Sequence, residues 1–310
     1  MGVSENIIKP QALRPGDTIG VVAPAAAVER AHLERGVAAL SAMGYRVKIS
    51  PHALDRSGIL AGEDVVRAAE LTAFFADPEV KAIFAARGGY GSGRLLPLFD
   101  FAALARTPKI FLGFSDETYL LNALVAQARM VAFHGPMVAM DFSHGVSAPA
   151  RDHLLRLLAG ETRELTLEAP TALRPGSARG PLLGGCLSVV VAMIGTPWEP
   201  LFDGAILFLE DTGEKAYRID RMLTQLGQAG ILRRVAGIVF GAIRPVEGSA
   251  REGALIRDFI GEATAQLDCP VLSGIEAGHG TANFALPLGL PAQLDATARC
   301  LVFTEAAVTT

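Results

Sequence analysis

Residues 109–118, which decide the fold class, read Lys109-Ile110-Phe111-Leu112-Gly113-Phe114-Ser115-Asp116-Glu117-Thr118. Apolar residues run into a serine, and leucines at helical spacing follow from position 120 onwards. A strand that passes into a helix through one tight turn exposes the turn residue and leaves the first N–H groups of the helix free to bind negative charge. Because Ser115 lies at that turn, it is the candidate nucleophile.

Strands alternate with helices on both sides of this stretch. Apolar strands are predicted at residues 18–23, 45–49, 80–85, 110–114 and 130–133, with helix-like spacing of apolar residues between most of them. The alternation predicts an α/β fold with a mostly parallel sheet and helices on both faces. Ligands bind such sheets outside the carboxyl ends of the strands. Ser115 and the glycine-rich segment 87–94 are both expected there.

Length and composition predict two domains. A chain of 310 residues is longer than a single hydrophobic core usually supports. Prolines and glycines gather after residue 160, which is typical of a linker. We therefore expect an N-terminal domain (1–160) that carries the nucleophile, a linker (161–181), and a smaller mixed α/β C-terminal domain (182–310).

The composition argues against several classes of partner. The net charge is −4 and no basic run occurs, so neither nucleic acid nor a membrane surface is an expected partner. No uninterrupted apolar run reaches the roughly 20 residues of a spanning helix. The first residues show neither a basic start nor an apolar block, so we expect a cytoplasmic protein. Three cysteines without a Cys-x-x-Cys pair predict reduced thiols.

A serine nucleophile needs a base within reach and a third group that orients the base. Among the six histidines, His279 stands in a loop of small residues and is the candidate base, while His134 follows a predicted strand and is a candidate wall of the site. Glu210 ends an apolar strand, where a carboxylate is costly to bury without a partner. The residues alone leave open whether Glu210 orients the base, or whether Glu210, Asp211 and Glu214 supply negative charge to the next helix.

The order Ser115, Glu210, His279 is that of α/β-hydrolases, but the turn differs from theirs. Glu117 stands where the G-x-S-x-G motif has glycine. The segment 87–94 also lacks the Gly-Lys-[Ser/Thr] ending of a phosphate-binding loop. Its glycines can instead bring a backbone N–H group to a reacting carbonyl. We assign the oxyanion hole to the backbone N–H groups of Asp116 and Gly89.

Five blocks in order resemble the LD-carboxypeptidase family of serine peptidases, which includes muropeptide-recycling enzymes and microcin C self-immunity peptidases. The resemblance runs from about Pro15 to Phe303. Its blocks are Arg87-Gly88-Gly89-Tyr90-Gly91, Gly113-Phe114-Ser115-Asp116-Glu117-Thr118, Phe133-His134-Gly135-Pro136, Leu209-Glu210-Asp211 with Tyr217-Arg218-Ile219-Asp220-Arg221, and Gly278-His279 with Leu286-Pro287-Leu288-Gly289.

The resemblance implies that Ser115 is the nucleophile, Glu210 the triad acid and His279 the base, in a homodimer that needs no metal and no cofactor. It implies hydrolysis, through an acyl-enzyme, of the amide bond between the L-centre of a diamino acid and a terminal D-alanine in a cell-wall tetrapeptide. Two alternatives remain open at this point. One is a peptidyl-nucleotide amidase of the microcin C type, and the other is a non-catalytic small-molecule binder on the same fold.

A carboxypeptidase must hold a free carboxylate, which arginine binds bidentately. Tyr90 and His134 are further candidate substrate contacts. Cys186 departs from the pattern of the family that the chain resembles, which usually has Gly-Gly-Asn-Leu where this chain has Gly-Gly-Cys-Leu. The departure puts one structural or substrate-side hydrogen bond in question and leaves the triad residues in place. The residues leave the candidate arginines unranked, and these are Arg87, Arg94, Arg218 and Arg244.

Overall fold

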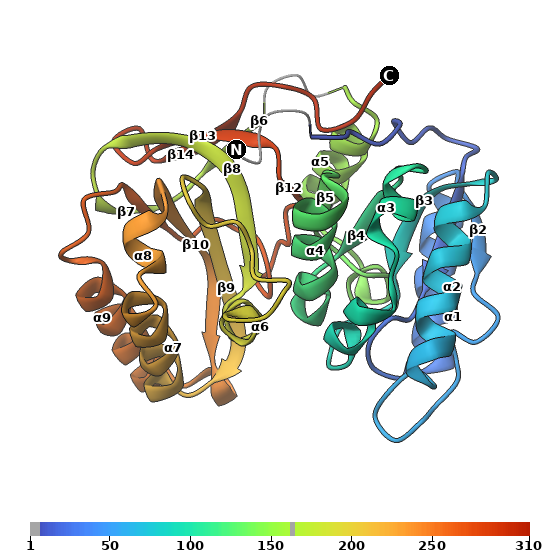
Figure 1. The fold of residues 1–310 in the computed structure, drawn as a ribbon, viewed down its shortest axis with the longest axis horizontal. Helices are drawn as coiled ribbons and strands as arrows, with labels where there is room; N and C mark the ends of the chain where they lie inside the picture. Colours follow the sequence, from blue (N-terminus) through green and yellow to red (C-terminus); the bar gives the residue numbers. More distant parts are fainter. Residues whose placement is uncertain (1–6, 162–164) are drawn as a thin grey trace.

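The computed structural model describes residues 7–161 and 165–310, and it shows two lobes that are each built around one sheet (Figure 1). In the described residues the strand order of the N-terminal sheet is β12-β5-β4-β3-β1-β2. Strands β1 to β5 run parallel, and β12 is antiparallel at one edge. This confirms the predicted mostly parallel sheet. The strands are β1 (Thr18–Val22), β2 (Arg46–Ile49), β3 (Val80–Ala85), β4 (Ile110–Gly113), β5 (Ala132–His134) and β12 (Leu286–Leu288).

The helices of the N-terminal lobe form where apolar residues recur on one face. In α1, for example, Leu33, Gly36 and Leu40 are buried, whereas the residues between them are mostly exposed. The α-helices are α1 (Arg30–Ala42), α2 (Asp64–Ala76), α3 (Phe101–Ala105), α4 (Thr118–Ala128) and α5 (Ala148–Leu158). Two 3-10 helices, η1 (Ser92–Leu98) and η2 (Ser115–Glu117), and a π-helical segment, η3 (Val138–Phe142), lie between them.

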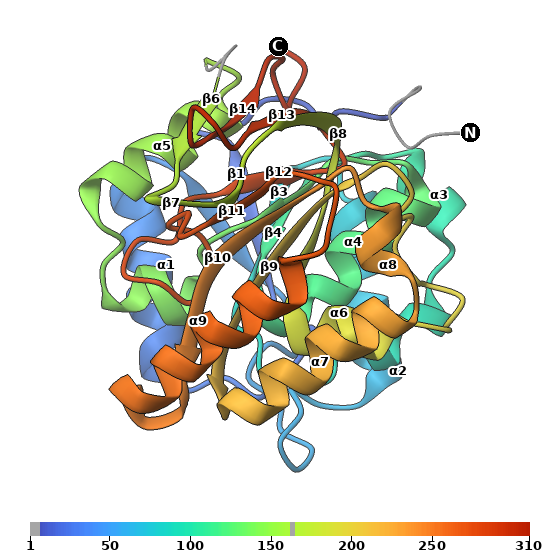
Figure 2. The ribbon, with the colours of Figure 1, turned by 90° about the vertical axis from the view of Figure 1, so that its left-hand side faces the viewer.

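The C-terminal lobe contains a second, mixed sheet. Its order in the described residues is β6-β14-β13-β8-β9-β10-β11-β7, and β8 to β11 run parallel. Figure 2 shows α7, α8 and α9 lying over one face of this sheet. The strands are β6 (Leu165–Glu168), β7 (Thr171–Arg174), β8 (Ser177–Cys186), β9 (Ile206–Glu214), β10 (Gly237–Pro245), β11 (Val271–Ser273), β13 (Pro291–Asp295) and β14 (Cys300–Phe303).

The helices of this lobe are α6 (Leu187–Met193), α7 (Ala216–Gln228), α8 (Ile231–Arg234) and α9 (Ala250–Thr264), with a short turn η4 (Val246–Gly248). On α7, Ile219, Leu223 and Leu226 are buried, as their helical spacing predicts. In the described ranges of both lobes, none of the helices is long and apolar enough to cross a membrane.

The stretch expected to link the two domains carries strands. Residues 165–168 and 171–174 form β6 and β7, and β8 begins at Ser177. The prolines and glycines that suggested a linker lie largely between these strands, at Pro170, Pro175 and Gly176. Residues 162–164 of the expected linker lie outside the described residues. The turn residues therefore separate short strands of the second sheet.

The lobes are joined by more than the chain connection. Asn122, buried in α4, donates from its amide to the Gly184 carbonyl of β8 at 2.8 Å and accepts from the Gly184 N–H at 3.1 Å. The same amide donates to the Thr118 carbonyl at 2.8 Å. The hydroxyl of Thr118 accepts from the Cys186 N–H at 3.0 Å. The side chains of Asn122 and Thr118 thus bond to backbone groups of β8 and fix the helix that follows Ser115 to the second sheet.

We predict that Asn122→Ala lowers the free energy of unfolding by about 2–4 kcal/mol, because it leaves the buried N–H and C=O groups of Gly184 without partners. Chemical denaturation followed by circular dichroism measures this loss. Gln225→Ala, on the exposed face of α7, is the control, and it should change the free energy by no more than about 0.5 kcal/mol. Equal losses in the two variants would contradict the role assigned to Asn122.

Candidate active site

Ser115 lies in a strained turn at the carboxyl end of β4. Its φ is +64°, a region that residues other than glycine seldom adopt. The glycine-rich segment packs against this turn, since a Cβ on Gly88 would lie 2.9 Å from the Ser115 Cβ and 3.2 Å from the Asp116 nitrogen. The Asp116 carboxylate in turn accepts from the Ser92 N–H at 2.7 Å. The two groups assigned to the oxyanion hole, the N–H groups of Asp116 and Gly89, thus belong to segments in contact.

Glu210 and His279 form the second half of the site. One Glu210 oxygen accepts hydrogen bonds from His279 Nδ1 at 2.7 Å and from the His279 backbone N–H at 3.0 Å. A carboxylate acceptor fixes the proton of a neutral imidazole on Nδ1 and leaves Nε2 unprotonated to act as a base. A Cβ on Gly278 would lie 2.3 Å from the same Glu210 oxygen. Only glycine at position 278 therefore allows this approach.

Phe114 connects the two halves. Its ring lies 4.7 Å from the His279 ring between centroids, and it directly precedes Ser115. In the described residues no hydrogen bond joins the Ser115 hydroxyl to His279. Catalytic hydrogen bonds are often long in structures without substrate and shorten in the complex. The structure therefore places Phe114, the residue before Ser115, against His279, which is itself bonded to Glu210.

The charge of Glu210 determines the protonation of the base. Burial alone would lower the pKa of His279, but the hydrogen bond and charge of Glu210, together with the charges of Asp211 and Asp141, raise that pKa above its ordinary value. A positive charge on His279 is therefore stabilised when the imidazole takes a proton.

The neighbouring acids, Asp211 and Glu214, have other partners. Asp211 accepts from the Ser188 N–H at 2.8 Å at the start of α6, and Glu214 pairs with Arg218 at 2.6 Å. The first N–H of α7 instead donates to Glu252 at 2.6 Å. Of the three acids that the sequence left open, Glu210 is the one in contact with the base.

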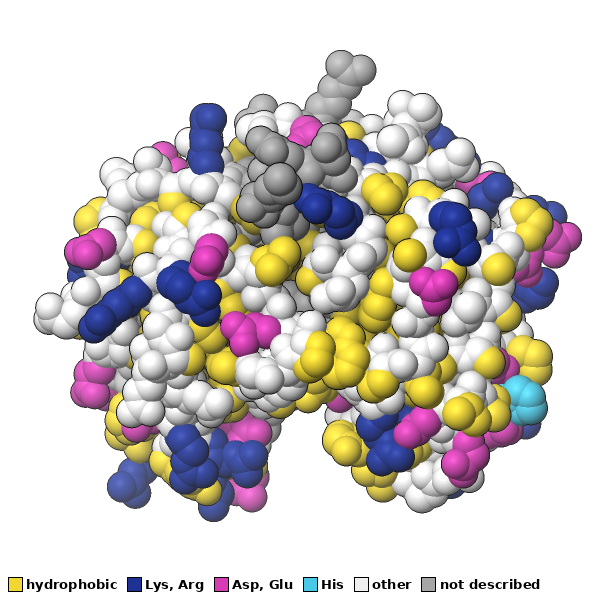
Figure 3. Space-filling view, in the orientation of Figure 1, with side chains coloured by type: hydrophobic (Ala, Val, Ile, Leu, Met, Phe, Trp, Pro, Cys, Tyr) yellow, Lys and Arg dark blue, Asp and Glu magenta, His cyan; other side chains and the backbone are white. Residues whose placement is uncertain are grey.

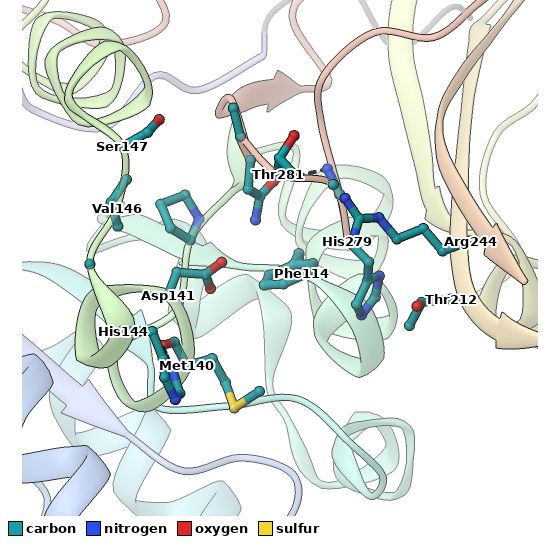
Figure 4. Close-up of a pocket in the computed structure, with 16 residues that line it drawn as sticks. Phe114, Met140, Asp141, His144, Val146, Ser147, Thr212, Arg244, His279 and Thr281 are labelled. Carbon is teal, nitrogen blue, oxygen red and sulfur yellow. Dashed lines mark hydrogen bonds between the residues drawn. The ribbon is translucent and has the colours of Figure 1, made fainter. Parts of the chain in front are cut away.

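Two cavities flank the turn of Ser115. The first, of about 360 Å³, is lined by Phe114 and His279, and Figure 4 shows these side chains on its floor. The second, of about 240 Å³, is lined by Asp116 and three aromatic side chains, Tyr90, Tyr119 and Trp198. Figure 3 shows the surface hollowed between the lobes at the lower edge, where β9 and β10 end in Figure 1. Ser115 thus lies between a residue that lines one cavity, Phe114, and a residue that lines the other, Asp116.

The predicted substrate contacts fall in different places. Tyr90 and Arg94 line the second cavity, and Arg244 lines the first. Arg87 donates to the Ala27 carbonyl at 3.2 Å. His134 is fully buried behind Phe114, with its ring 5.7 Å from the Phe114 ring.

His134 has no hydrogen-bond partner on either ring nitrogen among the described residues. Burial and the nearby charge of His279 lower its pKa to about 3, so it is neutral. The structure therefore places it among the apolar supports of the site and away from the cavity surface.

Sequence reasoning missed several polar residues of the first cavity. Asp141 and Thr212 line it, and Asn283 accepts from the Gly278 N–H at 2.9 Å, which fixes the loop of His279. Asn283 stands in that small-residue loop, so its position was a usable signal, whereas no local pattern marks Asp141. Among the described residues no group of three His, Cys, Asp or Glu side chains could hold a metal ion.

Glu117 is a buried acid without a partner. Its side chain is fully buried, and within the described residues neither carboxyl oxygen has a hydrogen bond. Burial, and then the charge of Asp116, raise the pKa of Glu117 well above its ordinary value. The residue that breaks the α/β-hydrolase motif is therefore held in its neutral, protonated form.

Comparison with known proteins matches both lobes to one family. Residues 19–135 match the LD-carboxypeptidase N-terminal domain, and residues 179–294 match the LD-carboxypeptidase C-terminal domain. The chain belongs to the LD-carboxypeptidase family. As a member it is a serine carboxypeptidase, which confirms the resemblance inferred from the five sequence blocks.

Relatives of this LD-carboxypeptidase family member cover almost the whole chain. A putative carboxypeptidase of Streptomyces coelicolor is 40% identical, over 97% of this chain and 98% of that one. A probable murein peptide carboxypeptidase of Bacillus subtilis is 38% identical, over 99% and 97%. The crystal structure of a muramoyltetrapeptide carboxypeptidase from Oxalobacter formigenes superposes with a TM-score of 0.83 at 32% identity, over 92% of this chain and 97% of that one.

We predict that the raised pKa of His279 sets the acidic limb of the pH profile. Because the base must be unprotonated, kcat/KM rises with pH and reaches half its plateau above pH 6.5, the ordinary histidine value. Glu210→Gln removes the stabilising charge, so the midpoint moves to lower pH and kcat falls by about 10³- to 10⁴-fold. Glu262→Gln, at an exposed position of α9, is the control and should leave the midpoint unchanged. An unshifted midpoint in Glu210→Gln would argue against the pairing.

We also predict that Glu117 makes the protein less stable as pH rises. The native state keeps a proton on Glu117 that the unfolded chain loses near its ordinary pKa of 4.5. Between that value and the raised native pKa the native state binds more protons, so the free energy of unfolding falls with increasing pH. Glu117→Gln should therefore be more stable than the wild type at pH 8, with the difference shrinking toward pH 4. Thermal unfolding at several pH values tests this, and a constant difference would refute it.

Proposed function

We propose that the enzyme hydrolyses the bond between the L-centre of a diamino acid and a terminal D-alanine in murein tetrapeptides, using a Ser115–His279–Glu210 triad. The observation that carries the proposal is the Glu210–His279 hydrogen bond of 2.7 Å beside the strained Ser115 turn. Relatives named as murein peptide and muramoyltetrapeptide carboxypeptidases support the choice of substrate.

In the first half of the reaction, His279 Nε2 takes the proton of the Ser115 hydroxyl as its oxygen attacks the peptide carbonyl. The negative oxygen of the tetrahedral intermediate is held by the N–H groups of Asp116 and Gly89. Glu210 stabilises the imidazolium that forms on His279. The C–N bond then breaks, and His279 gives its proton to the departing amine of D-alanine.

In the second half, a water molecule takes the place of the amine. His279 removes a proton from this water, which attacks the ester carbonyl of the acyl-enzyme. The intermediate collapses, the Ser115 oxygen recovers a proton from His279, and the shortened peptide leaves with a free carboxylate. The strained turn at Ser115 keeps the hydroxyl at the carboxyl end of β4 throughout both steps.

We predict that Ser115→Ala lowers kcat for D-alanine release from murein tetrapeptide by about 10⁵- to 10⁶-fold, because it removes the attacking oxygen. Release is measured by D-amino acid oxidation. The matched control is Ser41→Ala, on the exposed surface of α1, which should keep wild-type activity. A fluorophosphonate should label the wild type and the control at Ser115, and should leave Ser115→Ala unlabelled.

Two further substrates test the stereochemistry of the terminal residue and the class of substrate. A tetrapeptide that ends in L-alanine should be a poor substrate, and a peptidyl-nucleotide amide should have a lower kcat/KM than the tetrapeptide. A higher value for the nucleotide would assign the enzyme to the microcin C type. Full activity in Ser115→Ala would exclude the triad, and no labelling of the wild type would favour a non-catalytic binder.

A further inference from the structure

We infer that Arg244 is the specificity residue that binds the free C-terminal carboxylate of the substrate, in the cavity that it shares with His279. The inference rests on the proposed function, because it assigns one wall of that site to the departing amino acid. It ranks four arginines that the sequence left equal, and it explains how the enzyme distinguishes a terminal residue from an internal one.

The position of His279 indicates which part of the substrate each of the two cavities holds. In a serine peptidase the histidine that takes the nucleophile's proton later gives it to the leaving amine, so it faces the leaving-group side of the scissile bond. His279 lines the cavity of about 360 Å³, whereas the cavity of about 240 Å³ lies on the Asp116 side of the nucleophile. The departing D-alanine therefore occupies the cavity of His279, and the rest of the peptide extends toward the second cavity.

The ion pairs of the other arginines weigh against them. Arg94 pairs with Asp64 at 2.8 Å, and Arg218 pairs with Glu214 at 2.6 Å. A substrate carboxylate would have to compete with these protein carboxylates for the same guanidinium group.

Arg87 and Arg244 have no carboxylate partner in the described part of the chain, but they differ in place. Arg87 donates to a backbone carbonyl, that of Ala27, and does not line either cavity beside Ser115. Arg244 lines the cavity of His279, and its guanidinium group makes no hydrogen bond or ion pair among the described residues. Its five N–H donors are therefore available to a bound carboxylate.

The surroundings of Arg244 suit a carboxylate. Arg244 stands near the end of β10, where it pairs with Thr212 of β9, two residues beyond Glu210. Figure 4 shows its side chain extending from the strand into the cavity on the His279 side, with Asp141 on the opposite wall. Attraction to Arg244 and repulsion from Asp141 both direct a negative group toward β10.

We predict that Arg244→Ala removes the preference for a free C-terminus. The test compares murein tetrapeptide ending in D-alanine with the same peptide ending in D-alaninamide. In the wild type, kcat/KM for the acid should exceed that for the amide by about 10- to 100-fold, mostly through KM. In Arg244→Ala that ratio should fall close to one, because only the acid loses activity. Arg244→Lys keeps a point charge without the bidentate fork and should give an intermediate ratio.

A binding measurement separates this inference from the proposed function. Calorimetry with Ser115→Ala gives the Kd of the acid and the amide without turnover, and the same pair is measured in Ser115→Ala/Arg244→Ala. Ser115→Ala/Arg257→Ala, with an exposed arginine of α9, is the matched control. Tighter binding of the acid, lost only with Arg244, supports the inference. An acid-to-amide ratio that survives Arg244→Ala overturns it, whereas a wild type that releases no D-alanine overturns only the proposed function.

Discussion

The site depends on one piece of chain that belongs to both sheets. β11 pairs with β10 in the second sheet, whereas β12, which follows it, pairs with β5 in the first sheet through Leu286 and His134. The loop between these strands carries His279. Both ends of the loop are hydrogen-bonded into sheets, and its middle is held where Gly278 N–H donates to Asn283 and His279 N–H donates to Glu210. The hydrogen bonds of Asn122 with Gly184 also join the lobes, since they tie the helix that follows Ser115 to the sheet that carries Glu210.

Burial gives the ionisable groups around this loop different roles. His279 retains a partly exposed ring and a buried carboxylate partner, so a positive charge on it is favoured. His134 lies one layer deeper, has no partner and is neutral, so it cannot compete for protons with the base. Glu117, two residues after Ser115, is likewise kept protonated by burial.

Much of this arrangement could be predicted from the sequence, because it depends on patterns among residues that are close together in the chain. The alternation of apolar strands and helices predicts the parallel sheet, and a serine after Phe114 predicts the turn. The pairing of β12 with β5 could not be predicted, since three residues carry too little pattern to reveal a partner about 150 positions away. Pro170 and Gly176 indicate turns equally well in a linker and between short strands. The ranking of the arginines was beyond sequence reasoning for a similar reason, because it depends on which of them finds a carboxylate partner in the fold.

Cys186 stands where the resemblance to the family predicts an asparagine, and the fold accommodates the cysteine. Its side chain is buried and lies 3.3 Å from the Ser188 hydroxyl, while its backbone N–H donates to Thr118 at 3.0 Å. It also stands opposite Glu210 in the pairing of β8 with β9. The backbone near the end of β8 is therefore held by two side chains of α4. Asn122 bonds to Gly184, and the Thr118 hydroxyl accepts from the Cys186 N–H. Neither contact requires a side-chain amide at position 186. With cysteine at position 186, β8 keeps its register beside β9, and Cys186 stays paired with Glu210.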